Sequence, residues 1–499
     1  MLFNSYEFLL LLSVTLALYY LFEGAKQRVA ILILASLTFY GWWNYIYLAL
    51  LLGSVLCNFW ISRLLVGQGR KGLWLAIGIV FNLALLAFFK YADFVISSIN
   101  ILPAADLALL HIALPLAISF FTFQQIAFLV DQYKSKPAFY RFTDYLLFVS
   151  FFPQLIAGPI VHHREMMPQF KKRLIASDAL VNLSAGLALF ALGLFKKTIL
   201  ADQFAIYADG LFDGVDGGSG PTAVDAWIGS IAYSLQIYFD FSGYTDMALG
   251  IARMFGIRLP LNFFSPYKAR SIVDFWRRWH ITLSRFLRDY LYIPLGGNRK
   301  GAPRRYANLM ITMLLGGLWH GAGWTFVIWG GLHGLYLVIN HAWNELTATG
   351  RPLAALEGTG RLIGPALTFI AVVIAWVFFR AESFEDASQV LQGMAGINGL
   401  IGEGGLPVFA DVEALFWLAG GLAIVWFAPN SLQIMRRYRP AIDPSGITTS
   451  APAPKGISGR LTRAIAWRPT VPWAIASGVM AAAAMLTFSK VSPFLYFQF

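Results

Sequence analysis

The chain has 499 residues, of which 58% are hydrophobic and only 13% are charged, and its formal net charge is +12. Apolar runs of about 17–25 residues recur along most of it, and each is long enough to cross a hydrocarbon core of roughly 30 Å. This pattern excludes a soluble globular enzyme, and the single cysteine, Cys57, excludes an internal disulfide or a cysteine metal cluster. The sequence therefore predicts an all-α polytopic membrane protein.

The predicted spans follow one another along the chain. They cover residues 8–22, 29–49, 50–66, 73–89, 112–130, 180–195, 228–251, 363–379, 412–428 and 472–488. An apolar hairpin at 307–340 contains no Asp, Glu, Lys or Arg. The segment before the first span lacks a basic region and a small-residue cleavage site, so we expect a retained helix rather than a signal peptide. We treat 1–499 as one membrane domain.

The segment 145–161 is apolar but is interrupted by Pro153, Gly158 and Pro159. Basic residues flank it on both sides, so we expect it to enter and leave the membrane on the same side. Irregular backbone at membrane depth is tolerated only where protein or a wet cavity surrounds it. This segment therefore indicates a pore or a funnel.

Lysine and arginine predict the orientation. The stretch 253–305 carries twelve of them against two aspartates, a formal +10, and 429–470 carries seven. The loop 198–227 has five aspartates and no basic residue. By the positive-inside rule, 253–305 and 429–470 are cytoplasmic, 198–227 and 381–411 are periplasmic, and the N-terminus lies outside. Within the second cytoplasmic stretch, the Pro-, Ser- and Gly-rich residues 440–470 are expected to form a linker.

The segment 271–293 is predicted to be one amphipathic helix. Its apolar face holds Ile272, Phe275, Trp276, Trp279, Leu283, Phe286, Leu287 and Tyr290, and its other face is rich in arginine. This pattern is typical of a helix that lies in the membrane interface. Two roles stay open for the basic face: an anchor on anionic lipid, or a binding surface for an anionic substrate through Arg277, Arg278 and Arg285. His280 lies at the border of the two faces, where a packing role is also open.

Several other kinds of site are not supported. The adjacent histidines of "HHREM" (162–166) point to different faces of any regular element, so we expect no metal there. The segment "YIPLGGNRKG" (292–301) lacks the phosphate-loop pattern, which leaves nucleotide hydrolysis without support. We expect no bound metal and no nucleic-acid partner.

A histidine stands inside the apolar hairpin, in "GGLWHGAGW" (316–324). The four glycines around His320 are expected to leave room for backbone or a thin substrate, and Trp319 and Trp324 are expected to wall the ring off from water. A neutral histidine at membrane depth can simply bridge helices. In a narrow wet cavity, however, an imidazole with an ordinary pKa of about 6.5 suits a general base.

Three motifs carry a resemblance. They are "QIYFDFSGYTDMALGIARMFGIRLPLNFFSPYKARSIVDFWRRWHITLSRFLRDYLYIPLGGNR" (236–299), "MLLGGLWHGAGWTFVIWGGLHG" (313–334) and the ending "SPFLYFQF" (492–499). Together they are similar to the membrane-bound O-acyltransferase family, and within it to the bacterial alginate O-acetyltransferase branch. The likeness is densest over 236–334, which we therefore expect to be the catalytic core.

The resemblance implies a fold and a site. It implies a ring of about 10–12 transmembrane helices with re-entrant segments around a central funnel, in a multi-pass protein of the bacterial inner membrane. His320 matches the hallmark histidine of the family, and His280 matches its second signature position. Asp240, Tyr244 and Asp246 fall in a family stretch without an assignable role, and we keep Asp240 and Tyr244 as candidate substrate-binding residues.

The resemblance also implies a reaction. The donor is a cytoplasmic acyl thioester such as acetyl-coenzyme A, whose phosphates suit the +10 surface, and no cofactor is bound. The acceptor is reached from the other face, with a periplasmic, esterase-like partner protein. Three hypotheses stay open: O-acetylation of an exopolysaccharide, alginate first; O-acylation of another polymer such as cellulose, peptidoglycan or teichoic acid; or a transporter or flippase that performs no chemistry.

Overall fold

The chain is helical throughout the part that the structure describes. The computed structural model describes residues 1–67, 69–102, 105–134, 138–172, 176–215, 220–348, 357–400, 412–443, 445–450, 456–488 and 494–495. Within these ranges no strand occurs, and one isolated bridge joins Pro260 to Ile442. The prediction of an all-α protein is confirmed.

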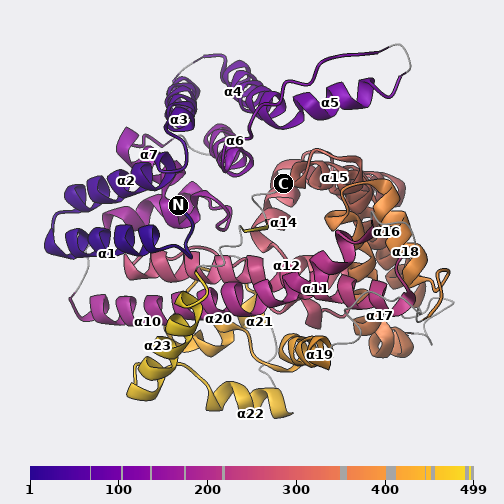
Figure 1. Cartoon of the computed structure of the whole chain (residues 1–499). Coiled ribbons are helices and arrows are strands. Elements are labelled where there is room, and N and C mark those ends of the chain that lie inside the picture. Colours follow the sequence, from indigo (N-terminus) through magenta and orange to yellow (C-terminus); the bar gives the residue numbers. More distant parts are fainter. Residues whose placement is uncertain are drawn as a thin grey trace.

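The N-terminal third forms two neighbouring groups of helices (Figure 1). The first group is α1 (Tyr6–Leu21) and α2 (Ala25–Gly41), and the second is α3 (Tyr45–Val66), α4 (Lys71–Leu86), α5 (Ala92–Ile99) and α6 (Ile118–Lys134). A π-helical turn, η1 (Ala87–Tyr91), joins α4 to α5. Ser5 and Asn44 cap α1 and α3 by accepting backbone N–H groups of the first turn, which is why these helices begin there. Helices α1 and α4 lie close to the predicted spans, but α2 ends at Gly41 and α3 begins at Tyr45, so the predicted boundary at 49–50 is wrong, and α6 begins later than the predicted span 112–130.

The interrupted segment 145–161 lies inside the protein. It consists of α7 (Phe142–Ser150), the short α8 (Phe152–Leu155) with Pro153 in its first turn, and a stretch before α9 (His163–Met166). Its side chains are buried, and α2, α3 and α12 pack around it. The expectation that protein surrounds this irregular backbone is confirmed.

The longest helix, α12 (Ala223–Met254), has 32 residues and crosses the middle of the molecule in Figure 1. It packs along α10 (Ala176–Phe195), α11 (Asp202–Phe212), α17 (Glu357–Arg380) and α18 (Phe384–Met394). A Cβ on Gly186 of α10 would lie 2.6 Å from the carbonyl oxygen of Gly250, so this pair of glycines permits close backbone contact. Because its side chains are buried along almost its whole length, α12 forms the centre of the core.

The expectation of an acidic loop over 198–227 is wrong for its first part. The π-helical turn η3 (Lys196–Ala201) carries the chain from α10 directly into α11. The aspartates of this region find cationic partners, because Lys197 pairs with Asp202 at 2.7 Å and Arg380 pairs with Asp213 at 2.9 Å. These ion pairs allow an acidic segment to be helical. Residues 216–219 lie outside the described ranges.

The segment 271–293 is not the single helix that the sequence predicted. It is divided into α13 (Ile272–Arg278), α14 (Ile281–Leu287) and the π-helical turn η6 (Arg288–Tyr292). The break falls at His280, whose φ of 41° places it in the left-handed region. The aromatic side chains of Phe275 and Trp279 are buried in the core instead of facing lipid. This segment is therefore part of the protein interior.

The remaining helices complete the far side of the molecule. The apolar hairpin is α15 (Gly301–His320) packed against α16 (Trp324–Thr347), as predicted. After α18 come α19 (Val412–Phe427), α20 (Ser431–Ile434), α21 (Ile447–Ser450), α22 (Gly456–Ala464) and α23 (Val471–Met485). The expected linker 440–470 thus contains α21 and α22, and Trp467 near its end is buried. Residues 401–411 and 451–455 lie outside the described ranges.

Length and composition identify membrane-spanning helices in the described part of the chain. Four stretches are long and apolar enough to cross a membrane: Tyr45–Val66, Lys71–Ile99, Asp178–Phe212 and Leu362–Arg380. Three shorter apolar helices accompany them: Tyr6–Leu21, Val412–Phe427 and Val471–Met485. Large apolar side chains such as Leu34 and Trp60 are exposed on the outside of this assembly. The chain is a polytopic membrane protein.

Candidate active site

His320 is the last residue of α15, and its side chain is only 4% exposed. Its ring contacts those of Trp319, Trp329 and Phe379, with centroids 4.9, 5.0 and 5.2 Å away. The expected wall from Trp319 is present. The expected wall from Trp324 is not, because that side chain starts α16 beyond the turn, is 56% exposed and contacts Phe94 instead. Trp329 and Phe379, which the sequence did not single out, take its place.

The glycines beside His320 serve helix packing. A Cβ on Gly317 would clash with the carbonyl oxygen of Phe326, and a Cβ on Gly321 would clash with the Phe326 ring. Gly317 also faces Gly330, where the backbones of α15 and α16 approach each other. Of the two expected uses of this room, close approach of backbone is therefore confirmed at Gly317, and α16 rather than a substrate takes up the space beside Gly317 and Gly321.

His280 lies next to His320. The two rings are 6.3 Å apart between centroids, and His280 is fully buried. Nδ1 of His280 lies 3.1 Å from Oδ1 of Asn262, and the same Asn262 atom accepts the backbone N–H of Thr282 at 3.2 Å. Because a backbone N–H can only donate, that atom is the amide oxygen, and His280 must donate to it from a protonated Nδ1. This tautomer leaves Nε2 as a proton acceptor.

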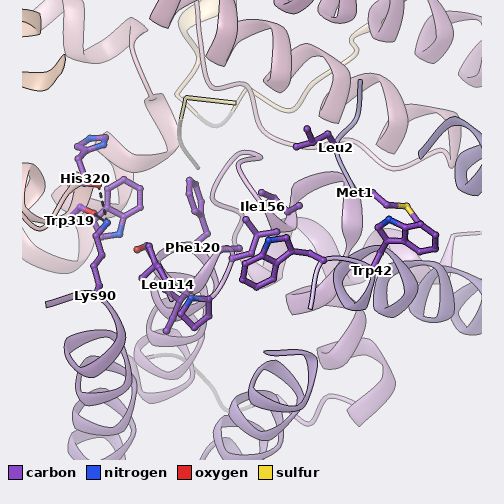
Figure 2. A pocket seen from close by; sticks show the side chains of 15 residues that line it. Met1, Leu2, Trp42, Lys90, Leu114, Phe120, Ile156, Trp319 and His320 are labelled. Carbon is purple, nitrogen blue, oxygen red and sulfur yellow. Dashed lines mark hydrogen bonds between the residues drawn. The ribbon is translucent and has the colours of Figure 1, made fainter. Parts of the chain in front are cut away.

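A pocket of about 450 Å³ reaches His320. Its lining is formed by Met1, Leu2, Trp42, Trp43, Lys90, Leu114, Pro115, Leu116, Ala117, Ile118, Ser119, Phe120, Ile156, Trp319 and His320. In Figure 2, His320, Trp319 and Lys90 lie at one end, and Met1 and Trp42 lie at the other. The lining is mostly apolar, so the histidine is the group in this pocket best suited to accept a proton from a hydroxyl.

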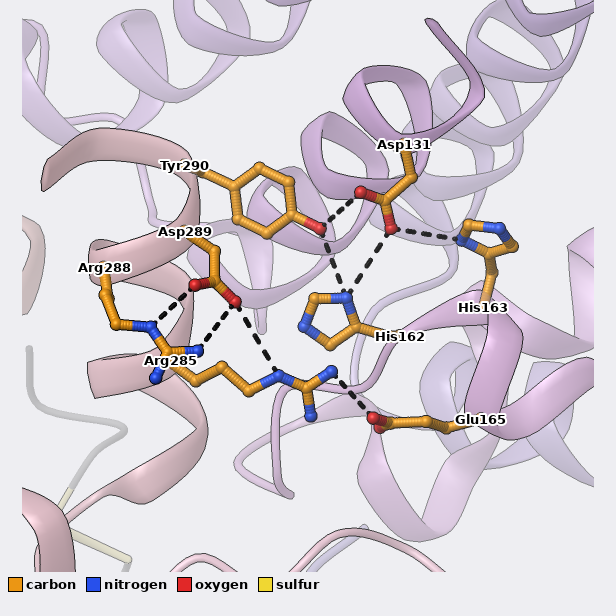
Figure 3. Close-up of polar contacts among 8 residues, drawn as sticks. All are labelled: Asp131, His162, His163, Glu165, Arg285, Arg288, Asp289 and Tyr290. Atoms are coloured by element: carbon orange, nitrogen blue, oxygen red, sulfur yellow. Dashed lines mark hydrogen bonds and ion pairs between the residues drawn. The ribbon is translucent and has the colours of Figure 1, made fainter. Parts of the chain in front are cut away.

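Two of the three candidate donor-binding arginines are engaged within the protein. Arg278 pairs with Asp274 at 2.8 Å. Arg285 pairs with Glu165 at 2.7 Å, as Figure 3 shows. Arg277 is exposed. The three residues that the sequence grouped on one helical face are thus divided between two helices, Arg277 and Arg278 on α13 and Arg285 on α14.

A polar cluster that the sequence did not predict joins three segments next to Arg285 (Figure 3). Asp131 of α6 lies 3.7 Å from Nδ1 of His162 and 3.6 Å from Nδ1 of His163. Tyr290 of η6 donates its hydroxyl to Asp131 at 2.9 Å. Among the described residues, no group of three or more His, Cys, Asp or Glu is arranged to hold a metal ion. This cluster ties α6 and η6 to the start of α9.

Aromatic rings fill the space between this cluster and His320. Trp319 stacks on Phe123 at 5.3 Å, and Phe123 stacks on Phe286 at 4.2 Å. Phe286 in turn contacts Tyr290 at 5.0 Å. A continuous column of rings therefore connects the histidine to the polar cluster.

Asp240 and Tyr244 lie on α12 and do not line the pocket that reaches His320. Asp240 pairs with Lys197 at 2.9 Å, and Asp246 pairs with Lys196 at 2.7 Å, so both carboxylates join α12 to the η3 turn. Tyr244 stacks between Phe3 and Phe494, with centroids 4.6 Å away on each side. None of these residues lines the His320 pocket. They lie behind the side chains that contact His280, because Phe241, the neighbour of Asp240, packs on the His280 ring with centroids 4.9 Å apart.

The sequence is similar to known acyltransferases. The model of the membrane-bound O-acyltransferase family matches residues 112–381, a range that contains both histidines. The peptidoglycan O-acetyltransferase of Helicobacter pylori is 48% identical over 398 residues, which cover 74% of each chain. The probable alginate O-acetylase AlgI of Pseudomonas aeruginosa is 38% identical over 543 residues and covers both chains completely.

A more distant relative broadens the range of acceptors. The teichoic acid D-alanyltransferase of Streptococcus thermophilus is 27% identical over 291 residues, which cover 53% of this chain and 68% of that protein. The names of these three proteins give different acceptors, but all three names describe the transfer of an acyl group. The chain is thus an acyltransferase that belongs to the membrane-bound O-acyltransferase family.

Proposed function

We propose that this protein transfers an acetyl group from cytoplasmic acetyl-coenzyme A to a polysaccharide hydroxyl on the outer side of a bacterial inner membrane. The observation that carries the proposal is the placement of His320 at the end of an open pocket, with His280 beside it. The family supports acyl transfer, and the relatives support a cell-envelope acceptor.

The pocket is proposed to open to the periplasm. Its lining comes from the start of the chain, the turn between α2 and α3, and the start of α6. The alternation of basic loops assigns each of these segments to the outer side, and it assigns 253–305 to the cytoplasm. Donor and acceptor would then approach His320 from opposite faces.

The proposed chemistry is general-base catalysis. His320 takes the proton from the acceptor hydroxyl while the oxygen of that hydroxyl attacks the thioester carbonyl carbon. The carbon–sulfur bond then breaks, and the coenzyme A thiolate leaves and collects a proton, so an ester and a free thiol result. General-base assistance of this kind contributes about 10²–10⁴-fold. His280 is proposed to orient the thioester or to relay the proton.

Alginate is the first candidate acceptor, because the Pseudomonas relative of that name matches the entire chain. Peptidoglycan is the second, because the Helicobacter relative has the higher identity over its shorter match. A periplasmic partner protein is proposed to complete the transfer. The exposed apolar side chains of Trp42, which lines the pocket, and of Tyr45 and Ile46 at the start of α3 would suit such a contact.

Purified protein in proteoliposomes, supplied with its periplasmic partner protein, acetyl-labelled coenzyme A and either alginate or peptidoglycan fragments, tests this proposal. We expect an acetyl ester on one acceptor and an equal amount of free thiol. Label that crosses the bilayer without thioester cleavage would instead indicate a transporter. Orientation is tested in a Cys57→Ala background, where we expect Leu400→Cys to react with an external reagent and Arg299→Cys to be protected.

A further inference from the structure

Lys90 is a buried basic residue next to His320. It lies on the η1 turn between α4 and α5, and its Nζ donates to the carbonyl of Trp319 at 2.7 Å and of His320 at 3.0 Å. The hydroxyl of Tyr91 donates to the carbonyl of Leu318 at 2.9 Å. Three successive carbonyls at the end of α15 are therefore bound by two successive side chains from one π-helical turn.

The end of an α-helix needs such partners. Its last four carbonyls have no intrahelical donor, and they carry the negative end of the helix dipole. α15 stops at His320, because Gly321 continues in an extended conformation. Lysine supplies several N–H donors and, when protonated, a positive charge that complements the dipole. The side chains of η1 thus hold the turn that carries His320.

Burying a lysine at membrane depth costs free energy, and ionisable residues found there usually have a function. Within the described part of the chain, both hydrogen bonds of Lys90 Nζ go to main-chain carbonyls of the His320 turn. Its side chain also lines two cavities, the pocket of about 450 Å³ that reaches His320 and one of about 290 Å³ beside Gly321 and Phe326. Lys90 therefore stands in the wall of the pocket and contacts the backbone of the candidate base.

We propose that Lys90 is a positioning residue that fixes the His320 imidazole for proton transfer by binding the carbonyls of its helical turn. This inference rests on the proposed function of His320. A π-helical turn is often found at functional sites, and here it lets adjacent residues reach the same helix end. A displacement of the base by about 1 Å can cost about 10²-fold in rate, so a loosened turn would impair turnover more than donor binding.

The test compares four variants of the full-length protein in proteoliposomes: Lys90→Met, Lys90→Gln, Lys90→Arg and Tyr91→Phe. We expect Lys90→Met to lower kcat about 10- to 100-fold, with a donor KM within about twofold of the wild type. Lys90→Arg should recover part of kcat, because guanidinium N–H groups can reach the same carbonyls. Tyr91→Phe, which removes only the bond to Leu318, should lose least.

Folding is monitored by gel-filtration profile and unfolding temperature. If Lys90→Met does not fold, Lys90→Gln decides the matter, since its amide nitrogen is one bond closer to the backbone than Nζ and brings no charge, so that it cannot replace the two carbonyl contacts of the lysine, and we expect a folded protein with reduced kcat. Wild-type kcat in Lys90→Met or Lys90→Gln would overturn the proposal, as would a rise in donor KM that accounts for the whole loss. His320→Ala separates the two hypotheses: if it is inactive while the Lys90 variants are normal, only the role of Lys90 fails.

Discussion

The rings of His280 and His320 lie 6.3 Å apart, although one precedes α14 and the other ends α15. His280 is held by Asn262 through Nδ1, so its Nε2 is the atom left to accept a proton. Two imidazoles thus share one region of the protein beside the pocket. In the proposed reaction, one of them is the base and the other supports it.

The first prediction separates the imidazole of His280 from its backbone. The residue has a φ of 41°, and asparagine tolerates this left-handed conformation better than alanine does. We expect His280→Asn to fold like the wild type but to lose about tenfold or more in kcat, because general acid–base help typically contributes 10²–10⁴-fold. His280→Ala should have both a lower activity and a lower unfolding temperature than the wild type. Normal turnover in His280→Asn would show that the imidazole is dispensable.

The second prediction concerns the donor. Arg278 and Arg285 already pair with carboxylates, whereas Arg277 is exposed. We expect Arg277→Gln to raise the donor KM more than Arg278→Gln or Arg285→Gln does. The difference should shrink at high salt, since exposed charges are screened over about 8–10 Å at physiological ionic strength. Equal donor KM values for wild type and Arg277→Gln would leave this arginine without a part in donor binding.

The third prediction assigns Asp240 to folding. Lys197 is buried against it, so Lys197→Met leaves a buried carboxylate without its partner, a change that typically costs about 3–5 kcal/mol. We expect a marked fall in the unfolding temperature of Lys197→Met. The double variant that combines Lys197→Met with Asp240→Asn should recover part of this fall. Lys196→Met breaks the more exposed pair with Asp246 and serves as the matched control, with a smaller fall. A stable Asp240→Asn protein with a raised substrate KM would favour a binding role instead.

The fourth prediction is a pH dependence of stability. Burial lowers the pKa of His163 to about 4, although the Asp131 carboxylate opposes part of this shift. In the unfolded chain the pKa of histidine is about 6.5. Between these values the unfolded state binds more protons, so stability should fall as the pH decreases from 6.5 toward 4.

The measurement is the unfolding temperature of the solubilised protein at pH 7.5 and pH 5. We expect His163→Phe, which keeps an aromatic ring beside Phe128 and Tyr140, to show a smaller decrease than the wild type. His111→Asn is the control, because His111 is exposed and its backbone conformation suits asparagine. An unchanged decrease in His163→Phe would assign the pH dependence to other groups.

Much of the fold could be predicted because the length of each apolar run and the charge of each loop can be read from neighbouring residues in the sequence. The positions of α1 and α4 and the hairpin of α15 and α16 follow from them, whereas α5 and the place of the turn between α2 and α3 do not. The helical course of 198–212 could not, because its aspartates depend on cations such as Arg380 that come much later in the chain. The break at His280 was equally hidden, since the aromatic spacing on both sides of it matches one uninterrupted helix.

The site was only partly predictable for the same reason. His280, His320 and Trp319 stand in motifs that can be read from the sequence. Lys90 ends an ordinary apolar run, and nothing near it indicates a contact with residues more than 200 positions later. Contacts of this kind arise only when helices distant in sequence pack side by side.

The central claim is that the His320 imidazole accepts the proton of the acceptor hydroxyl. It is tested most directly by acetyl-ester formation from labelled acetyl-coenzyme A in proteoliposomes that contain equal amounts of wild type, His320→Ala or His320→Asn. The asparagine amide can form hydrogen bonds but cannot accept a proton at neutral pH. We expect both variants to insert and fold normally yet to form no ester above background. Ester formation by folded His320→Asn at close to the wild-type rate would contradict this claim.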